Sequence, residues 1–163
     1  MLGLGSSLVS GTILSSVVTP DSISDLAFWF KNDTGVAAAQ WDDSSGNDNH
    51  MAQGTSGNQA SVSGGGLLFV DDNSDHYDLT TVVDIGASNA FTMIIVVNLV
   101  SYDSQNCILG DNDEADKFLE FQSADQMRFR QSSTSAVLKF PSSSPFPTGS
   151  KYMITMTKDT SRN

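Results

Sequence analysis

The chain has 163 residues, enough for one domain with a real hydrophobic core plus a tail, and too few for two ordinary domains. It carries 19 acidic against 8 basic residues, for a net charge of −11. Phosphate-rich partners require Lys and Arg, so this charge argues against binding to nucleic acid and to anionic membrane surfaces. All of the acid except Glu114 and Glu120 is aspartate, which favours turns. We therefore expect long polar loops.

Cysteine content and hydropathy bear on disulfide bonding, membrane insertion and secretion. Cys107 is the only cysteine, so no internal disulfide forms, and we expect a buried structural thiol in a short strand. The longest apolar run, Met93 to Val97, is far too short to span a bilayer. The first residues, Met1 to Leu8, lack a basic region and are broken by Gly and Ser, so we do not expect a signal peptide.

Residues 1–24 read as an extended N-terminal arm. They are rich in Gly and Ser and end near Pro20, where a regular element cannot continue. Such a segment cannot form a core of its own, yet it contains aliphatic side chains that would be wasted in a solvated linker. We expect the arm to order against a neighbouring subunit. The residues expected to bind the partner are Leu2, Leu4, Leu8, Ile13 and Leu14.

Beyond the arm, short strands follow one another with turn signals between them. Leu26–Phe30 is a dense aromatic strand, and Phe91–Leu99 is apolar on both faces, as in a central strand. Tyr152–Thr157 alternates with period two, apolar on one face and Thr or Met on the other. The remaining expected strands are Leu67–Val70, His76–Leu79, Cys107–Gly110, Lys117–Gln122, Gln126–Arg130 and Val137–Phe140. No stretch has a helical period, so the pattern predicts an all-β sandwich or barrel.

Four segments resemble, in order and spacing, the concanavalin A-like (laminin G-like) domains found in structural proteins of tailed bacteriophages. They are Leu26–Phe30, Gln40–His50, Leu68–Leu79 and Phe91–Val97. The resemblance implies an antiparallel jelly-roll β-sandwich over residues 25–163, with the arm at 1–24. Val70 and Asp72 depart from it, since the family often has Asp and Gly there. Such domains also continue for several strands beyond Thr157, so either the chain is part of a longer protein or a partner completes the sheet.

Catalysis is not expected. Glucanases with this sandwich use paired glutamates on one strand, and retaining hydrolysis needs carboxyls about 5 Å apart. Here Glu114 and Glu120 are not arranged in such a motif, and we expect Glu120 to face outward. His50 and His76 have no Ser or Cys nucleophile near them in sequence, so each is expected to be a hydrogen-bonded loop or strand residue.

No cofactor is required by any motif, and calcium is the alternative that the loops leave open. Asp and Asn oxygens are hard ligands, and Ca²⁺ gathers six to eight of them. Ordinary turn chemistry is the default explanation of the same residues, since Asp and Asn tolerate left-handed conformations and cap turns. The candidate ligands are Asp42, Asp43 and Asn47 in the first loop, Asp71, Asp72 and Asp75 in the second, and Asp111 and Asp113 in the third.

The tryptophans are expected to be structural rather than sugar-binding, because an aromatic side chain buries a large area. Trp29 lies inside an apolar strand, and Trp41 precedes a tight loop that it would anchor. We predict one core containing Trp29, Phe69, Phe91, Ile95, Val97 and Ile154.

The resemblance and the arm together imply a structural protein of a bacteriophage virion, as a capsid decoration, a fibre or a tail-associated component. The opening Met1–Leu8 also resembles the start of many tailed-phage structural proteins. The implied partners are other virion proteins of the capsid, neck or tail, with the chain present in several copies or as a homo-oligomer. Two alternatives share the fold: an adhesin that binds host glycans, and a glycoside hydrolase, which the missing glutamate motif disfavours. Fold alone does not decide among them.

Overall fold

The computed structural model describes residues 19–70, 73–83, 89–101, 106–110, 117–131, 134–139 and 146–159. Strands predominate in this part of the chain, and its helices are short 3-10 turns, among them η1 (Pro20–Ser22) and η2 (Ser56–Asn58). None of the helices described is long and apolar enough to cross a membrane. The prediction of an all-β chain is confirmed, and every strand pair described is antiparallel.

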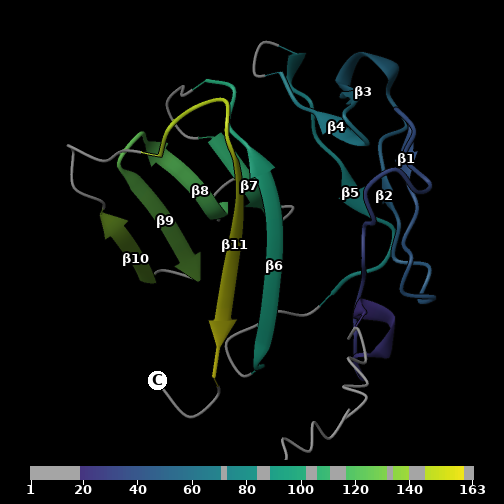
Figure 1. Cartoon of the computed structure of the whole chain (residues 1–163), viewed down its shortest axis with the longest axis horizontal. Helices are drawn as coiled ribbons and strands as arrows, with labels where there is room; N and C mark the ends of the chain where they lie inside the picture. Colours follow the sequence, from purple (N-terminus) through teal and green to yellow (C-terminus); the bar gives the residue numbers. More distant parts are fainter. Residues whose placement is uncertain are drawn as a thin grey trace, which may run out of the picture.

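The first group of strands is short. A three-stranded sheet contains β1 (Gln40–Trp41), β2 (Met51–Ala52) and β5 (Asp78–Leu79). A separate hairpin joins β3 (Ser61–Ser63) to β4 (Gly66–Leu68). Its turn needs two glycines in the left-handed region, Gly64 at φ 58° and Gly65 at φ 77°, which a side chain would disfavour. Figure 1 shows these strands together on one side of the molecule.

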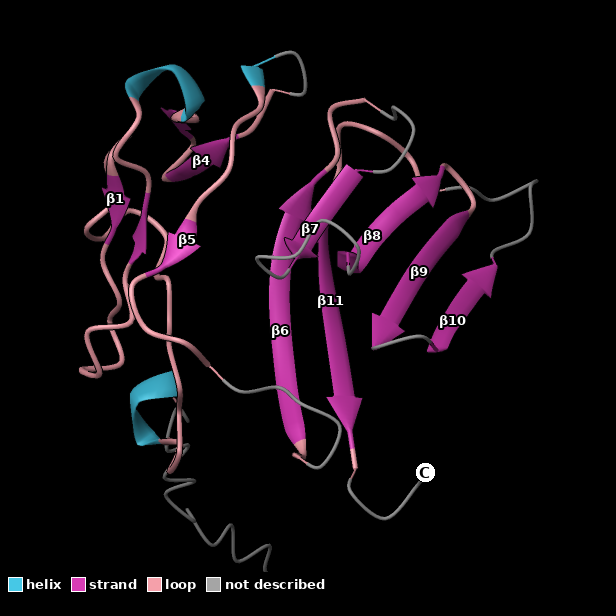
Figure 2. Cartoon of the chain, turned by 180° about the vertical axis from the view of Figure 1, so that it is seen from behind, coloured by secondary structure: helices cyan, strands magenta, loops and turns pink. Residues whose placement is uncertain are grey.

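The second group builds two layers. A four-stranded sheet has the order β10 (Thr134–Lys139), β9 (Gln126–Gln131), β8 (Lys117–Ser123) and β7 (Asn106–Gly110). The other layer is the pair of β6 (Phe91–Asn98) and β11 (Lys151–Lys158), matched over their full length. Both views show this pair lying against the four-stranded sheet (Figures 1 and 2). Among the described residues, no sheet combines strands of the first and second groups.

The hydrophobic core lies between these two layers. Its buried residues are Phe118, Leu119, Phe121 and Met127, all from β8 and β9. Partly buried side chains from β6, β7, β9, β11 and the segment before β11 pack against them, among them Phe91, Ile95, Val97, Phe129, Phe146 and Ile154. Perpendicular ring pairs close the packing, with centroids 4.6 Å apart for Phe118–Phe129 and 5.3 Å for Phe121–Phe146.

The core prediction was right for Phe91, Ile95, Val97 and Ile154 and wrong for Trp29 and Phe69. Trp29 precedes the first group of strands, and Phe69 lies within it, between β4 and β5. Neither belongs to the core cluster. Phe69 is 52% exposed, with its ring edge-on to Tyr77. An apolar sequence pattern shows that a side chain is suited to burial, but not which of two strand groups buries it.

Three further expectations about strands need correction. Leu26–Phe30 is not in a described ladder, because loop side chains bind its backbone. β6 is not central in the described sheets: it pairs only with β11, and its residues alternate between half-buried and exposed. Cys107 is exposed rather than buried, and it lies on β7, an outer strand of its sheet, between two half-buried neighbours.

The alternation expected for Tyr152–Thr157 is confirmed. Tyr152, Ile154 and Met156 point to the half-buried side of β11, while Met153, Thr155 and Thr157 are exposed. The β6–β11 pair therefore has an inner face that contributes to the core and an outer face that is open to solvent.

Candidate functional site

The loop after β1, residues 42–50, is organised around the carboxylate of Asp43. Its Oδ1 accepts the backbone N–H groups of Trp29 and Ser45, both at 2.8 Å. Its Oδ2 accepts the Ser45 hydroxyl at 2.7 Å and the Asn49 backbone N–H at 3.1 Å. Asp43 is 9% exposed, so four donors satisfy a nearly buried carboxylate.

Two asparagines of the same loop hold the aromatic segment before it. The Asn47 side-chain amide donates to the Leu26 carbonyl at 2.6 Å, and the Asn49 amide donates to the Ala27 carbonyl at 2.6 Å. The Ser44 backbone N–H donates to the Trp29 carbonyl at 2.8 Å. These bonds replace a strand ladder for residues 26–29, which explains why an extended apolar segment is not part of a sheet.

His50 closes the loop as a hydrogen-bond acceptor. Its Nδ1 accepts the backbone N–H of Asp43 at 3.0 Å, so the ring proton of the neutral tautomer sits on Nε2. Nε2 lies 3.9 Å from Oδ1 of Asp48. The prediction that His50 is a hydrogen-bonded loop residue is confirmed. His76 also matches, since its Nδ1 lies 2.9 Å from the Ser74 carbonyl.

These hydrogen bonds shift the pKa of Asp43. Burial acts to raise the pKa of this carboxyl, but the bonds from Ser45, Trp29 and Asn49 stabilise the ionised form and outweigh it. The pKa of Asp43 is therefore lowered from its ordinary value of 3.8. The ionised carboxylate is thus part of the folded loop.

The candidate calcium ligands divide into two sets. Asp71, Asp72, Asp111 and Asp113 lie outside the described residues. Of the others, Asp43 has both oxygens engaged as above, Asp42 accepts from the Gln40 amide at 2.7 Å, and Asp75 accepts from the Val70 backbone N–H at 2.8 Å. The Asn47 amide binds backbone carbonyls. In the described ranges, no three His, Cys, Asp or Glu side chains gather as a metal site would require.

Both tryptophans have structural contacts. The Trp41 indole N–H lies 3.2 Å from the carbonyls of Lys31 and Thr34, so it fixes the preceding turn, whereas the sequence predicted that it would anchor the loop that follows. Trp29 has the Lys31 ammonium 5.5 Å from its ring centroid, a cation–π contact. Gly35 permits the turn itself: its φ is 62°, and a Cβ there would lie 2.6 Å from Cβ of Asp42.

A buried ion pair crosses the β8–β9 hairpin. Glu120 is fully buried and pairs with Arg128, its direct cross-strand neighbour. The expectation that Glu120 faces outward is therefore wrong. The signal was present in the sequence, because Glu120 and Arg128 are placed almost symmetrically about the turn at residues 124–125. The pairing of a buried carboxylate with a guanidinium across one hairpin suits a structural role.

The outer face of the β6–β11 pair is the largest described feature that sequence reasoning missed. Ile94, Val96 and Met153 are 60%, 67% and 72% exposed. Val96 and Met153 are direct register partners, and Ile94 lies two residues along the same face. Val100, beyond the end of β6, is 66% exposed. The apolar character of β6 on both faces predicts burial on both, and the structure buries only one of them within the described chain.

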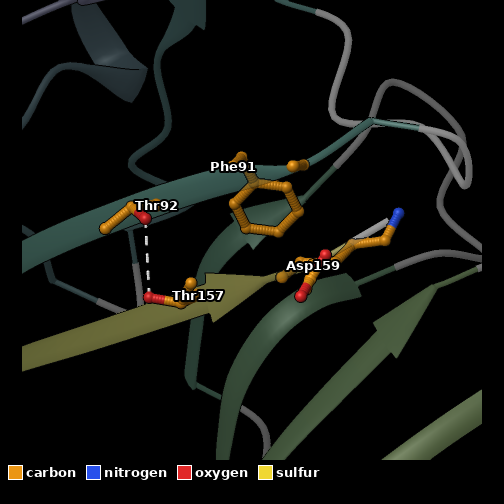
Figure 3. A pocket seen from close by; sticks show the side chains of 6 residues that line it. Phe91, Thr92, Thr157 and Asp159 are labelled. Atoms are coloured by element: carbon orange, nitrogen blue, oxygen red, sulfur yellow. Dashed lines mark hydrogen bonds between the residues drawn. The ribbon is translucent and has the colours of Figure 1, made fainter. Parts of the chain in front are cut away.

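At one end of this outer face lies a shallow hollow (Figure 3). It is lined by Ala90, Phe91, Thr92, Thr157, Lys158 and Asp159. Thr92 and Thr157 are register partners whose hydroxyl oxygens lie 3.5 Å apart. The Phe91 ring contacts Phe118 of the core, with centroids 5.8 Å apart. The hollow thus lies at the rim of the sheet. We name Ile94, Val96 and Met153 the outer apolar face.

No family model, no curated protein and no solved structure matches the chain. The class that the structure itself defines is an all-β protein with antiparallel sheets. The arm residues Leu2, Leu4, Leu8, Ile13 and Leu14 lie outside the described residues.

Proposed function

We propose that the chain is a structural component of a bacteriophage virion, held in the particle by apolar contacts. The single observation that carries the proposal is the outer apolar face. Soluble proteins seldom expose contiguous apolar side chains without an interaction partner. Here three large aliphatic or thioether side chains stand together at 60% exposure or more, on a chain of net charge −11.

The pattern of β6 supports an interface rather than an open surface. A strand that is apolar on both faces is normally covered on both. β6 contributes Phe91, Ile95 and Val97 to the core, while Ile94 and Val96 face solvent. A second molecule in the particle would bury the uncovered side.

The finer fold is part of the proposal. We propose that the two layers of the second strand group belong to a concanavalin A-like jelly roll, in which the segments Leu26–Phe30, Gln40–His50, Leu68–Leu79 and Phe91–Val97 hold their family positions. The packing of β6 and β11 on the four-stranded sheet supports this. The Asp43 loop supports it too, since residues 40–50 form one ordered unit.

The proposal is tested by incorporation into particles. We expect the full chain to be present in purified virions, and a chain lacking residues 2–18 to fold in isolation but to be lost from them. Mass spectrometry of the particles measures the copy number, and circular dichroism checks folding. Incorporation of the truncated chain at normal copy number would remove the arm as anchor. Absence of the full chain from virions would remove the proposal.

Phe69 favours a second candidate, binding to host glycans. Its ring is 52% exposed and stands edge-on to Tyr77, with centroids 5.7 Å apart, and exposed rings can stack on sugars. If the chain is an adhesin, Phe69→Ala should leave the fold intact and abolish binding to host cell-surface glycans. Unchanged binding by Phe69→Ala would exclude this ring as the site.

A further inference from the structure

β6 presents an open, uncharged sheet edge beside the outer apolar face. In the described part of the chain, β6 pairs with β11 alone, so its other edge has no described partner strand. Both views place β6 at the margin of the second strand group (Figures 1 and 2). Half of the backbone N–H and C=O groups along such an edge point away from the existing partner and can pair with an added strand.

The two edges of this sheet are protected very differently. Proteins commonly guard edge strands with Lys, Pro or inward charges. β11 has Lys151 at its first position and Lys158 at its last. β6, with the sequence Phe-Thr-Met-Ile-Ile-Val-Val-Asn, has neither charge nor proline over eight residues. The β6 edge is therefore the one suited to accept a strand.

The N-terminal arm has the composition that fits this edge. Residues 2–18 contain no charged residue, whereas the chain as a whole has a net charge of −11. Valine, isoleucine and threonine, which favour strands, occur among them at Val9, Thr12, Ile13, Val17 and Val18. An uncharged arm pays no desolvation of charge when it lies beside Ile94 and Val96.

The length of the arm is also sufficient. At about 3.3 Å per residue, the 17 residues from 2 to 18 reach about 56 Å, and the eight residues of β6 extend over about 26 Å. Eight arm residues can match β6, which leaves 17 − 8 = 9 residues as a tether. The arm can thus bridge to another molecule while pairing along the whole strand.

We propose that residues 2–18 of one copy add a strand to the β6 edge of a neighbouring copy, beside Ile94 and Val96 of its outer apolar face. The interaction is β-strand addition: backbone pairing supplies affinity, and alternate side chains of the arm contact Ile94 and Val96. This inference rests on the proposed structural role and names the partner as a second copy of this chain.

The direct test uses a synthetic peptide of residues 2–18 and the chain lacking these residues. We expect fluorescence anisotropy to show binding, and hydrogen exchange to slow at the amides of β6. Ile94→Lys and Val96→Lys place charge beside the β6 edge at exposed positions, so both should fold and bind the peptide at least about tenfold more weakly. Val82→Lys is the matched control, because Val82 is 92% exposed but lies outside this face, and its binding should not change.

Sedimentation of the full chain distinguishes the arm of a second copy from other possible occupants of the β6 edge. We expect concentration-dependent self-association that is lost in the truncated chain and in Val96→Lys. No peptide binding, or equal binding by Val96→Lys, would overturn the inference. So would a truncated chain that still self-associates, because two sheets would then meet directly. A full chain that stays monomeric with β6 already protected would show the arm folding back on its own sheet, which also overturns it.

The peptide-binding and sedimentation experiments do not depend on virion assembly, so they test the inference separately from the proposed function. If arm deletion abolishes incorporation into virions but the peptide does not bind the chain, the arm docks on a different virion protein. In that case the inference fails and the proposed function stands. If the peptide binds as expected but virions lack the chain, the inference stands and the proposed function fails.

Discussion

Replacement of Asp43 tests whether its carboxylate organises the loop of residues 42–50. Asp43→Ala removes the acceptor of three backbone N–H groups, those of Trp29, Ser45 and Asn49. Each donor that loses its partner in a partly buried site costs about 1 kcal/mol, so the free energy of unfolding should fall by about 3 kcal/mol. Asp43→Asn keeps one oxygen but turns an amide toward a donor, and should cost about half as much.

Asp42→Asn is the matched control for this experiment. Asp42 is adjacent, its side chain is 54% exposed, and it accepts one described side-chain bond, from Gln40. Its replacement should change stability by less than about 0.5 kcal/mol. Urea titration followed by tryptophan fluorescence is the assay, because Trp29 is hydrogen-bonded to Asp43 and Trp41 precedes the loop. Equal effects of Asp43→Ala and Asp42→Asn would refute the reasoning.

Three further outcomes follow from the described contacts. The folded-state pKa of Asp43 lies below 3.8, so the stability that its ionised carboxylate contributes is present above that value and is lost as the pH falls through the lower folded-state pKa. Between about pH 5 and about pH 3, wild type should therefore lose more stability than Asp43→Asn. Equal losses would contradict this. Arg128→Met leaves the buried Glu120 unpaired and should lower the free energy of unfolding by about 3–5 kcal/mol, measured by thermal or urea denaturation. Adding Glu120→Leu should recover most of this loss. A double variant as unstable as the single one would argue against the pair. Tyr77→Phe removes the hydroxyl that donates to the Ala38 carbonyl at 2.5 Å and should lower stability by about 1 kcal/mol, and an unshifted urea midpoint would show that the bond contributes nothing.

The longer strands could be predicted because their pattern is strong. Phe91–Leu99 and Tyr152–Thr157 correspond to β6 and β11, and the expected strands Lys117–Gln122 and Gln126–Arg130 correspond to β8 and β9. The two-residue strands β1 and β2 could not be found this way, since they are too short to show a period.

The errors have a common physical cause, which is that local patterns do not identify partners. The segment Leu26–Phe30 is apolar and extended, but its carbonyls and N–H groups bind Asp43, Asn47 and Asn49 from more than a dozen residues away. Glu120 is expected at the surface when it is considered alone, and its burial follows only when Arg128, opposite it in the hairpin, is considered with it. The residues of the Asp43 loop were noted as oxygen ligands, and their role in binding backbone groups required the three-dimensional arrangement.

The central claim is that the outer apolar face is an assembly surface. A cryo-EM map of the intact particle that contains this chain tests it most directly. We predict that Ile94, Val96 and Met153 lie within about 4 Å of another chain, with an additional strand paired along β6. A map in which these side chains face solvent and the β6 edge has no neighbour would contradict the claim.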